Sequence, residues 1–462
     1  MRIRLIEPGP PGPNIYSYSR YPRLGLPMIG AALQQHGHDV RIYNPQLAAI
    51  DWQDVYAADL VGLSTITSTA PSAYEYADDL RARGIPVIIG GSHVTFLAGE
   101  ALEHADYVAR GEGGEALMLE LIDAFQGLRE LVSIPGLSFM KDGQEVHNEL
   151  RERCRDLDEL PLPDLSLIVG HERLTSTPVM TSWGCPFACS FCSVTTMFGH
   201  RTRCRSIESV IAELKQRQPR RVFFYDDNFA TDRARLKKLL RAMIEEGLVM
   251  PWTAQVRTDV VRDPELLDLM RRSGCDRLCL GLESVNQETL DGYAKSQSVE
   301  DIVRAVATLR RYHIKTHGMF VLGGDGDTVQ TLRDTVKFAL RHHIDSLMLN
   351  ILTPGPGTKQ YADMNAQGRM LDTRWHLYDG QHVVFKPQQM TPDELQRETM
   401  HCYRRFYSTR RLMGSVLTFR LGRVRVQTWG WWYVRSWRRE KSNRLFMKAL
   451  RRPQLTPSAV TD

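Results

Sequence analysis

The sequence predicts an α/β protein built from two strand–helix blocks and a helical tail. Short apolar runs alternate with helical patterns through the first 125 residues, a second alternation begins at residue 177, and the pattern after about residue 385 is helical and basic. Such alternation is typical of parallel sheets that are covered by helices. We therefore divide the chain into a front domain (1–145), a linker (146–176), a barrel domain (177–385) and a C-terminal region (386–462).

The front domain contains five expected strands, at residues 2–8, 38–44, 60–65, 86–91 and 106–111. The first helical pattern between them ends at Gly37, a residue type that commonly terminates helices. This order predicts a doubly wound parallel sheet with helices on both faces. Ligands bind such sheets at the carboxyl ends of the strands. The polar or glycine residues at two of these ends are Ser64, Thr65, Gly91, Ser92 and His93. Ordinary glycine turns are the alternative explanation.

The linker loses this periodicity, and Pro161 and Pro163 favour an extended segment. The second block has six expected strands, at residues 178–183, 220–227, 252–257, 277–284, 316–324 and 346–352, with helices between most of them. Six strands are too few for the closed eight-stranded barrel, which takes about 250 residues. The block therefore predicts an open, partial (β/α)6 barrel.

Composition narrows the class of protein. A chain of 462 residues can bury a core without disulfides, and its eight cysteines are too dilute for a secreted disulfide scaffold. We find no signal peptide and no apolar run of about 18 residues. We therefore expect a cytoplasmic protein whose thiols are reduced and available to metals.

The net charge of +5 is unevenly distributed. Residues 401–453 hold fifteen Lys or Arg and one acidic residue, Glu440, a net +14; Asp462 is the only charge beyond them, so the first 400 residues carry −8. Residues 404–439 interleave arginines with aromatic side chains, four tryptophans among them. This pattern fits peripheral contact with the inner face of a membrane. A basic face whose tryptophans pack on the body and an RNA-binding tail are the alternatives.

A cysteine motif follows the first strand of the barrel domain. Cys185, Cys189 and Cys192 form the spacing C-x-x-x-C-x-x-C on one loop. Thiolates select zinc or iron–sulfur clusters, and such clusters normally take four cysteine ligands. Three ligands would leave one iron open to a substrate or cofactor, as catalytic zinc sites keep one open position. The alternative is a structural zinc site completed by His200 or Cys204.

This motif, followed by six strand–helix units, resembles the radical S-adenosylmethionine (SAM) superfamily. The resemblance implies a 4Fe–4S cluster on Cys185, Cys189 and Cys192 whose open iron binds SAM. An electron from a flavodoxin- or ferredoxin-type partner then releases a 5′-deoxyadenosyl radical. The resemblance also places SAM contacts at the later strand ends, although the chain lacks the Gly-Gly-Glu stretch that members often carry after the second strand. These positions, each of which could instead be an ordinary turn or salt bridge, are Asp226, Asp227, Arg257, Glu283, Ser284, Gly323 and Gly324.

The front domain resembles the cobalamin-binding subgroup of that superfamily. The matching stretches are LGLPMIGAALQQHGHDVRIYN, LVGLSTITST, IIGGSHVT and ARGEGGEAL, in that order. The resemblance implies that Ser64, Thr65, Gly91, Ser92 and His93 cradle cobalamin. None of the fourteen histidines stands two residues after an Asp, so the D-x-H motif is absent and the implied cobalamin has no histidine below its cobalt. An empty docking domain is the alternative.

Together these resemblances imply a cobalamin-dependent radical SAM enzyme, and specifically a C-methyltransferase acting on an unactivated carbon of a lipid-like or natural-product small molecule. Residues 379–396 resemble the closing region of members that act on hopanoids and porphyrins. One alternative is an oxidative or ring-forming enzyme of the anaerobic cyclase type. Another is a cobalamin or cluster sensor with a nucleic-acid-binding tail. The intact cysteine motif argues against the sensor, so we expect no specific nucleic-acid partner.

Overall fold

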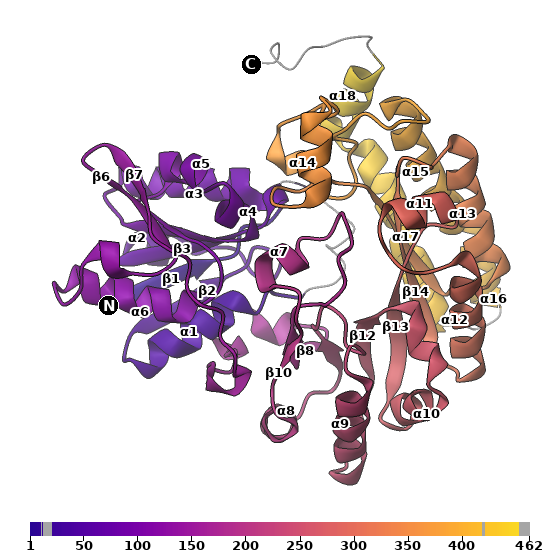
Figure 1. Cartoon of the computed structure of the whole chain (residues 1–462), viewed down its shortest axis with the longest axis horizontal. Coiled ribbons are helices and arrows are strands. Elements are labelled where there is room, and N and C mark those ends of the chain that lie inside the picture. Colours follow the sequence, from indigo (N-terminus) through magenta and orange to yellow (C-terminus); the bar gives the residue numbers. More distant parts are fainter. Residues whose placement is uncertain (11, 13–20, 418–420, 452–462) are drawn as a thin grey trace.

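The structure is a computed structural model that describes residues 1–10, 12, 21–417 and 421–451. Two sheets stand side by side, and helices complete the C-terminal region (Figure 1). The fold class predicted from the sequence is therefore confirmed. Residues 418–420 and 452–462 of the expected basic tail lie outside the described part of the chain.

The front domain is a seven-stranded sheet in the order β2-β1-β3-β4-β5-β6-β7. The first five strands are parallel, and β6 and β7 add an antiparallel hairpin. Helices α1 and α6 bury one face, and α2, α3 and α5 bury the other (Figure 1). The strands are β1 (Arg2–Ile6), β2 (Asp39–Tyr43), β3 (Leu60–Thr65), β4 (Val87–Gly91), β5 (Tyr107–Ala109), β6 (Leu137–Lys141) and β7 (Gln144–His147). The helices are α1 (Gly25–Gln35), α2 (Trp52–Tyr56), α3 (Ala70–Ala82), α4 (Ser92–Phe96), α5 (Ala98–His104) and α6 (Gly114–Phe125).

Part of the expected linker packs on the front domain. Leu165, Leu167 and Ile168 are buried in the same cluster as α1. The backbone N–H of Val169 donates to the carbonyl of Ile42 in β2 at 2.9 Å, so this stretch lines the outer edge of the sheet. The proline-rich segment therefore travels along the front domain before it reaches the barrel.

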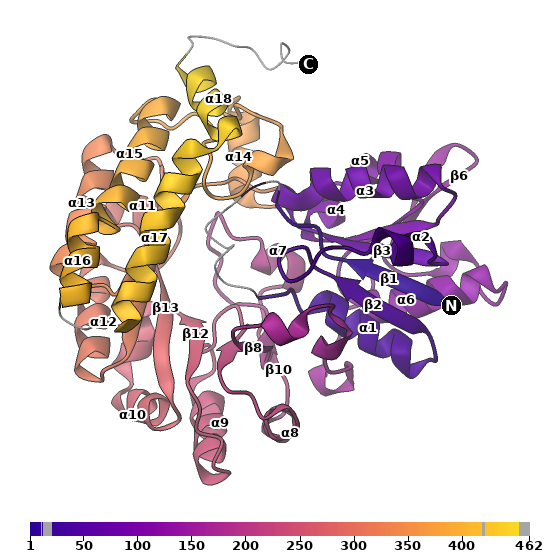
Figure 2. The same ribbon diagram turned by 180° about the vertical axis from the view of Figure 1, so that it is seen from behind.

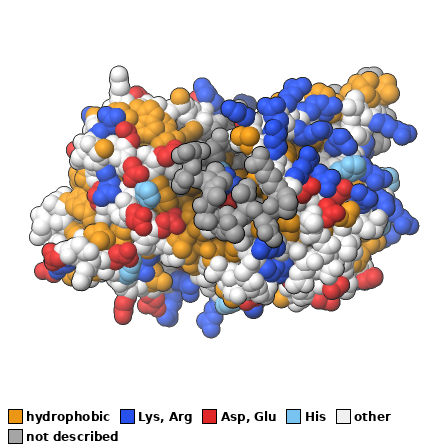
Figure 3. All heavy atoms as spheres, turned by 90° about the horizontal axis from the view of Figure 1, so that it is seen from above, with side chains coloured by type: hydrophobic (Ala, Val, Ile, Leu, Met, Phe, Trp, Pro, Cys, Tyr) orange, Lys and Arg blue, Asp and Glu red, His pale blue; other side chains and the backbone are white. Residues whose placement is uncertain are grey.

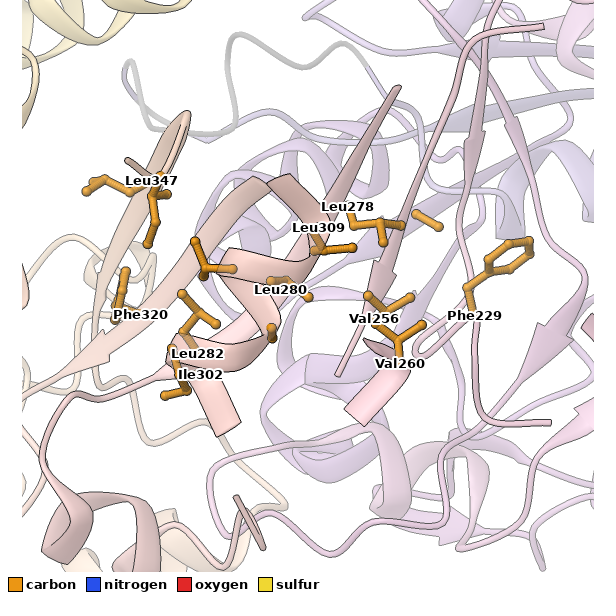
Figure 4. Close-up of a cluster of buried hydrophobic side chains, with 14 of the residues drawn as sticks. Phe229, Val256, Val260, Leu278, Leu280, Leu282, Ile302, Leu309, Phe320 and Leu347 are labelled. Carbon is orange, nitrogen blue, oxygen red and sulfur yellow. The ribbon is translucent and has the colours of Figure 1, made fainter. Parts of the chain in front are cut away.

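The barrel domain is a six-stranded parallel sheet whose strands follow chain order. Leu278, Leu280 and Leu282 of β13 pack with Ile302 and Leu309 of α12 (Figure 4). The residues that alternate with these leucines along the strand, and the corresponding residues of the other strands, therefore have inward parity and face the inside of the open barrel. The strands are β8 (Thr177–Val179), β11 (Val222–Phe224), β12 (Trp252–Val256), β13 (Cys275–Glu283), β14 (Lys315–Leu322) and β15 (Ser346–Ile351). The helices are α8 (Ile207–Arg217), α9 (Arg233–Glu245), α10 (Pro264–Arg272), α11 (Gln287–Gly292), α12 (Val299–Arg311), α13 (Val329–Arg341) and α14 (Lys359–Ala366).

The outer edge of the barrel sheet is capped by the C-terminal region. The N–H groups of alternate residues on β15 point away from β14: Leu347 donates to Tyr407 Oη (3.0 Å) and Leu349 to Tyr403 Oη (2.7 Å). Tyr407 Oη also donates to the carbonyl of Leu347 at 2.7 Å. Both tyrosines belong to the end of α15 (Pro392–Phe406) or follow it directly. Tyrosine hydroxyls thus replace the missing neighbouring strand.

The basic tail forms three further helices, α16 (Thr409–Leu417), α17 (Leu421–Arg439) and α18 (Lys441–Leu450), which lie against the barrel (Figure 2). Trp437 is buried, Trp429 packs against the barrel core, and Trp431 Nε1 donates to Thr409 Oγ1 at 3.1 Å. Trp432 is 46% exposed. Two of the four tail tryptophans, Trp429 and Trp437, therefore pack on the body, and Trp431 bonds within the tail. None of the described helices combines the length and the apolar character that crossing a bilayer requires.

Candidate active site at the domain interface

The three motif cysteines lie on a hairpin at the carboxyl end of β8. This cysteine hairpin (residues 182–204) consists of β9 (Ser182–Trp183), the cysteine-bearing loop, α7 (Val194–Phe198) and β10 (Arg203–Cys204), which pairs antiparallel with β9. Gly184 opens the loop with φ +85°, and a Cβ there would lie 2.4 Å from the carbonyl oxygen of Arg201. The middle of the loop is held by Ser190, which donates from its N–H to Tyr293 and accepts from the N–H of Gln360.

The three thiols are free and partly buried. Burial raises the pKa of Cys185 and raises that of Cys192 to about 11. Among the described residues, no three His, Cys, Asp or Glu side chains are arranged to hold a single metal ion. A four-iron cluster separates its thiolate ligands more widely than one zinc ion does, so three thiols on one loop fit the cluster better than a zinc site with His200 or Cys204.

Arg257 connects the third barrel strand with the cysteine loop. Its guanidinium lies 3.8 Å from the centre of the Phe187 ring, and Nη1 lies 4.0 Å from Cys189 Sγ. Nη2 donates to the carbonyl of Lys295. A cation held beside the thiols suits a site that collects negative charge when they ionise.

The two acidic residues after β11 contact the start of the cysteine hairpin. Asp226 is buried and accepts hydrogen bonds from Thr181 N (2.7 Å), Thr181 Oγ1 (2.7 Å) and Ser182 Oγ (2.6 Å). Asp227 Oδ2 accepts from Gly184 N at 3.0 Å, and burial raises its pKa to about 6. Both side chains therefore fix the loop in place, and Asp227 lies next to the thiols.

The fourth and fifth strand ends meet at two buried groups. Glu283, with φ +59°, forms an ion pair with Lys295 at 2.7 Å. Asp327 accepts hydrogen bonds from Thr289 Oγ1 (2.7 Å) and from the backbone N–H groups of Gly323 (2.9 Å) and Gly324 (3.2 Å), and Ser284 Oγ lies 3.4 Å away. Asp327 thus brings together Ser284, Gly323 and Gly324. The sequence pattern did not single out Asp327, although it directly follows the glycine turn.

The expected cobalamin cradle lies at the carboxyl ends of β3 and β4. Gly91 has φ +113°, and a Cβ there would lie 2.1 Å from the carbonyl oxygen of Thr65, so only glycine fits. Thr65 Oγ1 donates to the carbonyl of Gly90 at 3.0 Å, and the Ser64 carbonyl accepts from Arg23 Nη2 at 2.9 Å. Ser92 begins α4. The two strand ends therefore approach each other closely, and Ser64, Thr65, Gly91 and Ser92 have small side chains, which favours the approach of a broad macrocycle.

His93 takes part in a contact between the two domains. It is 1% exposed, and its Nε2 lies 3.3 Å from Glu100 Oε1. Trp375 of the barrel domain donates from Nε1 to Glu100 Oε2 at 3.0 Å and lies edge-on to the His93 ring. The His93 side chain is thus enclosed between the two domains.

A second contact joins the cobalamin side to the cysteine side. Glu112 follows β5, at the same edge of the sheet as the cradle, and Arg203 lies on β10 of the cysteine hairpin. Arg203 Nη1 and Nη2 donate to the two carboxylate oxygens of Glu112 at 2.8 and 2.6 Å. The spacing of the sequence could not reveal this pair, because 91 residues separate its members.

Comparison with known proteins agrees with this geometry. Residues 179–339 match the model of the radical SAM superfamily, and residues 14–119 match the B12 binding domain. The chain is 30% identical to an uncharacterized methyltransferase of Pyrococcus horikoshii over 84% of this chain and 88% of that relative. The chain belongs to the radical SAM superfamily. With its B12 binding domain, it is a cobalamin-dependent radical SAM enzyme, and the expected cofactors (4Fe–4S cluster, SAM and cobalamin) are confirmed.

Other relatives of this radical SAM enzyme act on tetrapyrroles. It is 29% identical to the bacteriochlorophyllide d C-12(1)-methyltransferase of Chlorobaculum tepidum, over 84% of this chain and 83% of the relative. It is 30% identical to the anaerobic magnesium-protoporphyrin IX monomethyl ester cyclase of Cereibacter sphaeroides, over 77% of this chain and 60% of that relative. Its fold is similar to that of the radical SAM methyltransferase TsrM from Kitasatospora setae, with a TM-score of 0.65 at 20% identity over 79% of this chain and 75% of that one.

The residues present suit the cofactors that the family implies. Cys185, Cys189 and Cys192 would hold the cluster, and the Gly91 edge would receive cobalamin. The bound cofactors supply one-electron cleavage of SAM and methyl-transfer chemistry. The chain's own task is to hold the cysteine loop against Asp227 and Arg257 and, through Glu112 and Arg203, to fix the cradle relative to the loop.

Proposed function

We propose that this enzyme transfers a methyl group to an unactivated carbon of a lipid-like or natural-product substrate. The observation that carries the proposal is that the cysteine hairpin and the cobalamin edge are joined directly, through Glu112 and Arg203. One molecule bound in the barrel can then approach both cofactors, as methyl transfer to a substrate radical requires.

The inside of the barrel has an apolar part and a polar part. The half-buried residues of inward parity are apolar at Phe223, Met319, Val321 and Met348, and polar at Thr253, Gln255, Arg277 and His317. Among them stands Asn350, whose Oδ1 is buried without a hydrogen-bond partner among the described residues. Such a lining supports a substrate that has a large apolar surface and some polar groups, because apolar walls bind the first and polar side chains fix the orientation.

The test uses anaerobically reconstituted enzyme, methyl-labelled SAM and, in turn, a polyisoprenoid lipid and a tetrapyrrole as probes. We expect labelled product together with S-adenosylhomocysteine and 5′-deoxyadenosine. The similarity to the cyclase favours a second candidate, an oxidative ring closure. That reaction would form 5′-deoxyadenosine and a modified substrate that carries no label.

We also propose that the C-terminal region contacts an anionic membrane surface at the cytoplasmic face, through α16 rather than through the tryptophans. Met413, Val416 and Leu417 are 53%, 46% and 74% exposed and have the i, i+3, i+4 spacing of one helix face. Basic residues around it include Arg405 and Arg410, both exposed. Figure 3 shows Lys and Arg side chains gathered on the side that carries this region. Each basic residue near an anionic surface contributes about 1 kcal/mol.

Co-sedimentation with vesicles tests this contact. We expect binding to phosphatidylglycerol vesicles, weaker binding at high salt and little binding to phosphatidylcholine. Serine at Met413, Val416 and Leu417 should weaken binding at least about tenfold, because inserted aliphatic side chains contribute about 1.5–3 kcal/mol each when fully buried. Serine at the equally exposed Leu128, Val132 and Met140 of the front domain is the matched control. Binding to RNA with no binding to vesicles would contradict the proposal.

A further inference from the structure

Glu112 is held rigidly by the front domain. It stands between Gly111 (φ +77°) and Gly113 (φ +84°), and Gly111 N donates to Thr95 Oγ1 at 3.1 Å. A Cβ at Gly113 would lie 2.4 Å from Cδ of Arg151, so this turn depends on glycine. The carboxylate therefore projects from β5 in one fixed direction.

Arg203 is held with equal rigidity by the cysteine hairpin. Arg203 pairs with Trp183 in the β9–β10 ladder, and Trp183 lies two residues before Cys185. Its guanidinium also donates to the carbonyls of Phe198 at the end of α7 (3.4 Å) and of Cys154 in the linker (2.6 Å). One side chain thus fixes both ends of the hairpin and the linker.

The ion pair is enclosed, with 5% of the Glu112 side chain and 13% of the Arg203 side chain exposed. A bidentate pair between a guanidinium and a carboxylate fixes orientation as well as distance. The contact of Trp375 with Glu100 lies on other elements and does not touch the cysteine hairpin. Arg153 of the linker does reach it: its Nε lies 3.7 Å from Glu112 Oε1, and its Nη2 donates to the carbonyl of Thr196 in α7 at 3.5 Å. Glu112 is therefore the carboxylate through which Arg203, reinforced by Arg153, ties the cysteine hairpin to the cobalamin edge.

We propose that Glu112 and Arg203 are positioning residues that set the distance between the cysteine loop and the cobalamin cradle for methyl transfer from SAM to cobalamin. In that step the carbon–sulfur bond of SAM breaks as a carbon–cobalt bond forms. Co(I) supplies the electron pair, and sulfur leaves with its own pair as S-adenosylhomocysteine. The inference rests on the proposed function. Cleavage of SAM at the cluster takes place within the barrel domain and needs no fixed distance to the cobalamin cradle, so it should not depend on the pair.

The test compares Glu112→Gln with Asp54→Asn in the full-length, reconstituted and reduced enzyme without substrate. Asp54 forms an equally enclosed bidentate pair with Arg4, at 2.6 and 2.9 Å, but within the front domain. We expect Glu112→Gln to lower S-adenosylhomocysteine formation by about 10- to 100-fold, the range that a displacement of about 1 Å can cause. Formation of 5′-deoxyadenosine and the iron and cobalamin contents should remain those of the wild type. Asp54→Asn should leave the ratio of the two products unchanged.

Hydrogen exchange of the cofactor-free chain gives a second readout. Residues 198–205 should exchange faster in Glu112→Gln than in Asp54→Asn. Arg203→Lys keeps the charge but loses the bidentate geometry, so its exchange rate should lie between those of Glu112→Gln and the wild type. An unchanged product ratio with unchanged exchange would overturn the proposal. So would a Glu112→Gln protein that loses both products and its cofactors together, because that result indicates a purely structural role. A wild type that forms neither product refutes the proposed function instead, and the exchange experiment still tests the pair.

Discussion

Replacement of Glu283 by Gln tests how the fourth barrel strand is stabilised. The Glu283–Lys295 pair is 2.7 Å long, and each side chain is 8% exposed. The amide would leave the Lys295 ammonium buried without its counter-charge, a change that costs about 3–5 kcal/mol. For a domain of about 200 residues, each kcal/mol corresponds to about 2–4 °C, so the melting temperature should fall by about 6–20 °C. The double variant Glu283→Gln/Lys295→Met should recover most of this loss, because removing both charges of a buried pair is close to neutral.

Thermal unfolding of the cofactor-free protein, followed by circular dichroism, measures both variants. Asp363→Asn is the control, since the Lys359–Asp363 pair is 73% and 47% exposed. We expect its effect to stay within about 0.5 kcal/mol. The reasoning is refuted if Glu283→Gln melts within 2 °C of the wild type, or if the double variant melts below the single one. The positive φ of Glu283 is common to all these proteins and therefore does not affect the comparison.

Three further results are expected. Replacing the motif cysteines by alanine should remove the bound iron and the formation of 5′-deoxyadenosine, yet change the stability of the cofactor-free chain by only about 1 kcal/mol. A wild-type protein that binds zinc but no iron would contradict the assignment of these cysteines to an iron–sulfur cluster. Tyr407→Phe should lower the melting temperature, because two hydrogen bonds to β15 are lost and unsatisfied buried groups cost about 1–3 kcal/mol each, whereas Tyr56→Phe, at an exposed hydroxyl, should not. Burial lowers the pKa of His317 to about 3, so below about pH 6.5 the unfolded chain binds one more proton than the folded chain. The free energy of unfolding should therefore fall by about 1.4 kcal/mol for each pH unit of acidification. The melting temperature of His317→Asn should depend less steeply on pH.

Local sequence signals were sufficient for the elements that bury a regular apolar face. The barrel strands, the Gly91 turn and the cysteine loop all follow from alternation, glycine placement and spacing. The β6–β7 hairpin gave no such signal, because one side of β7 is solvent-exposed and carries no apolar alternation. The sheet expected from the sequence therefore ended at the fifth strand.

Contacts between distant residues were beyond the reach of the sequence. Asp226 was expected near SAM, and it binds Thr181 and Ser182 instead of standing open. The tail tryptophans looked like lipid anchors, and two of them, Trp429 and Trp437, pack on the body because α17 lies along α15 and α16. Such partners are chosen by the three-dimensional approach of elements, which no spacing along the chain records.

The tyrosine cap on β15 affects how the protein must be synthesised. Tyr403 follows the end of β15 by about 50 residues, so at about 5–20 residues per second the strand waits roughly 3–10 s for its partner hydroxyls. During that time its outer N–H groups are open to pairing with a neighbouring nascent chain. Ribosomes that are closely spaced on one message would bring such edges together. Slow translation between codons 352 and 403 should therefore lower the yield of folded enzyme, although every residue of the final protein is unchanged.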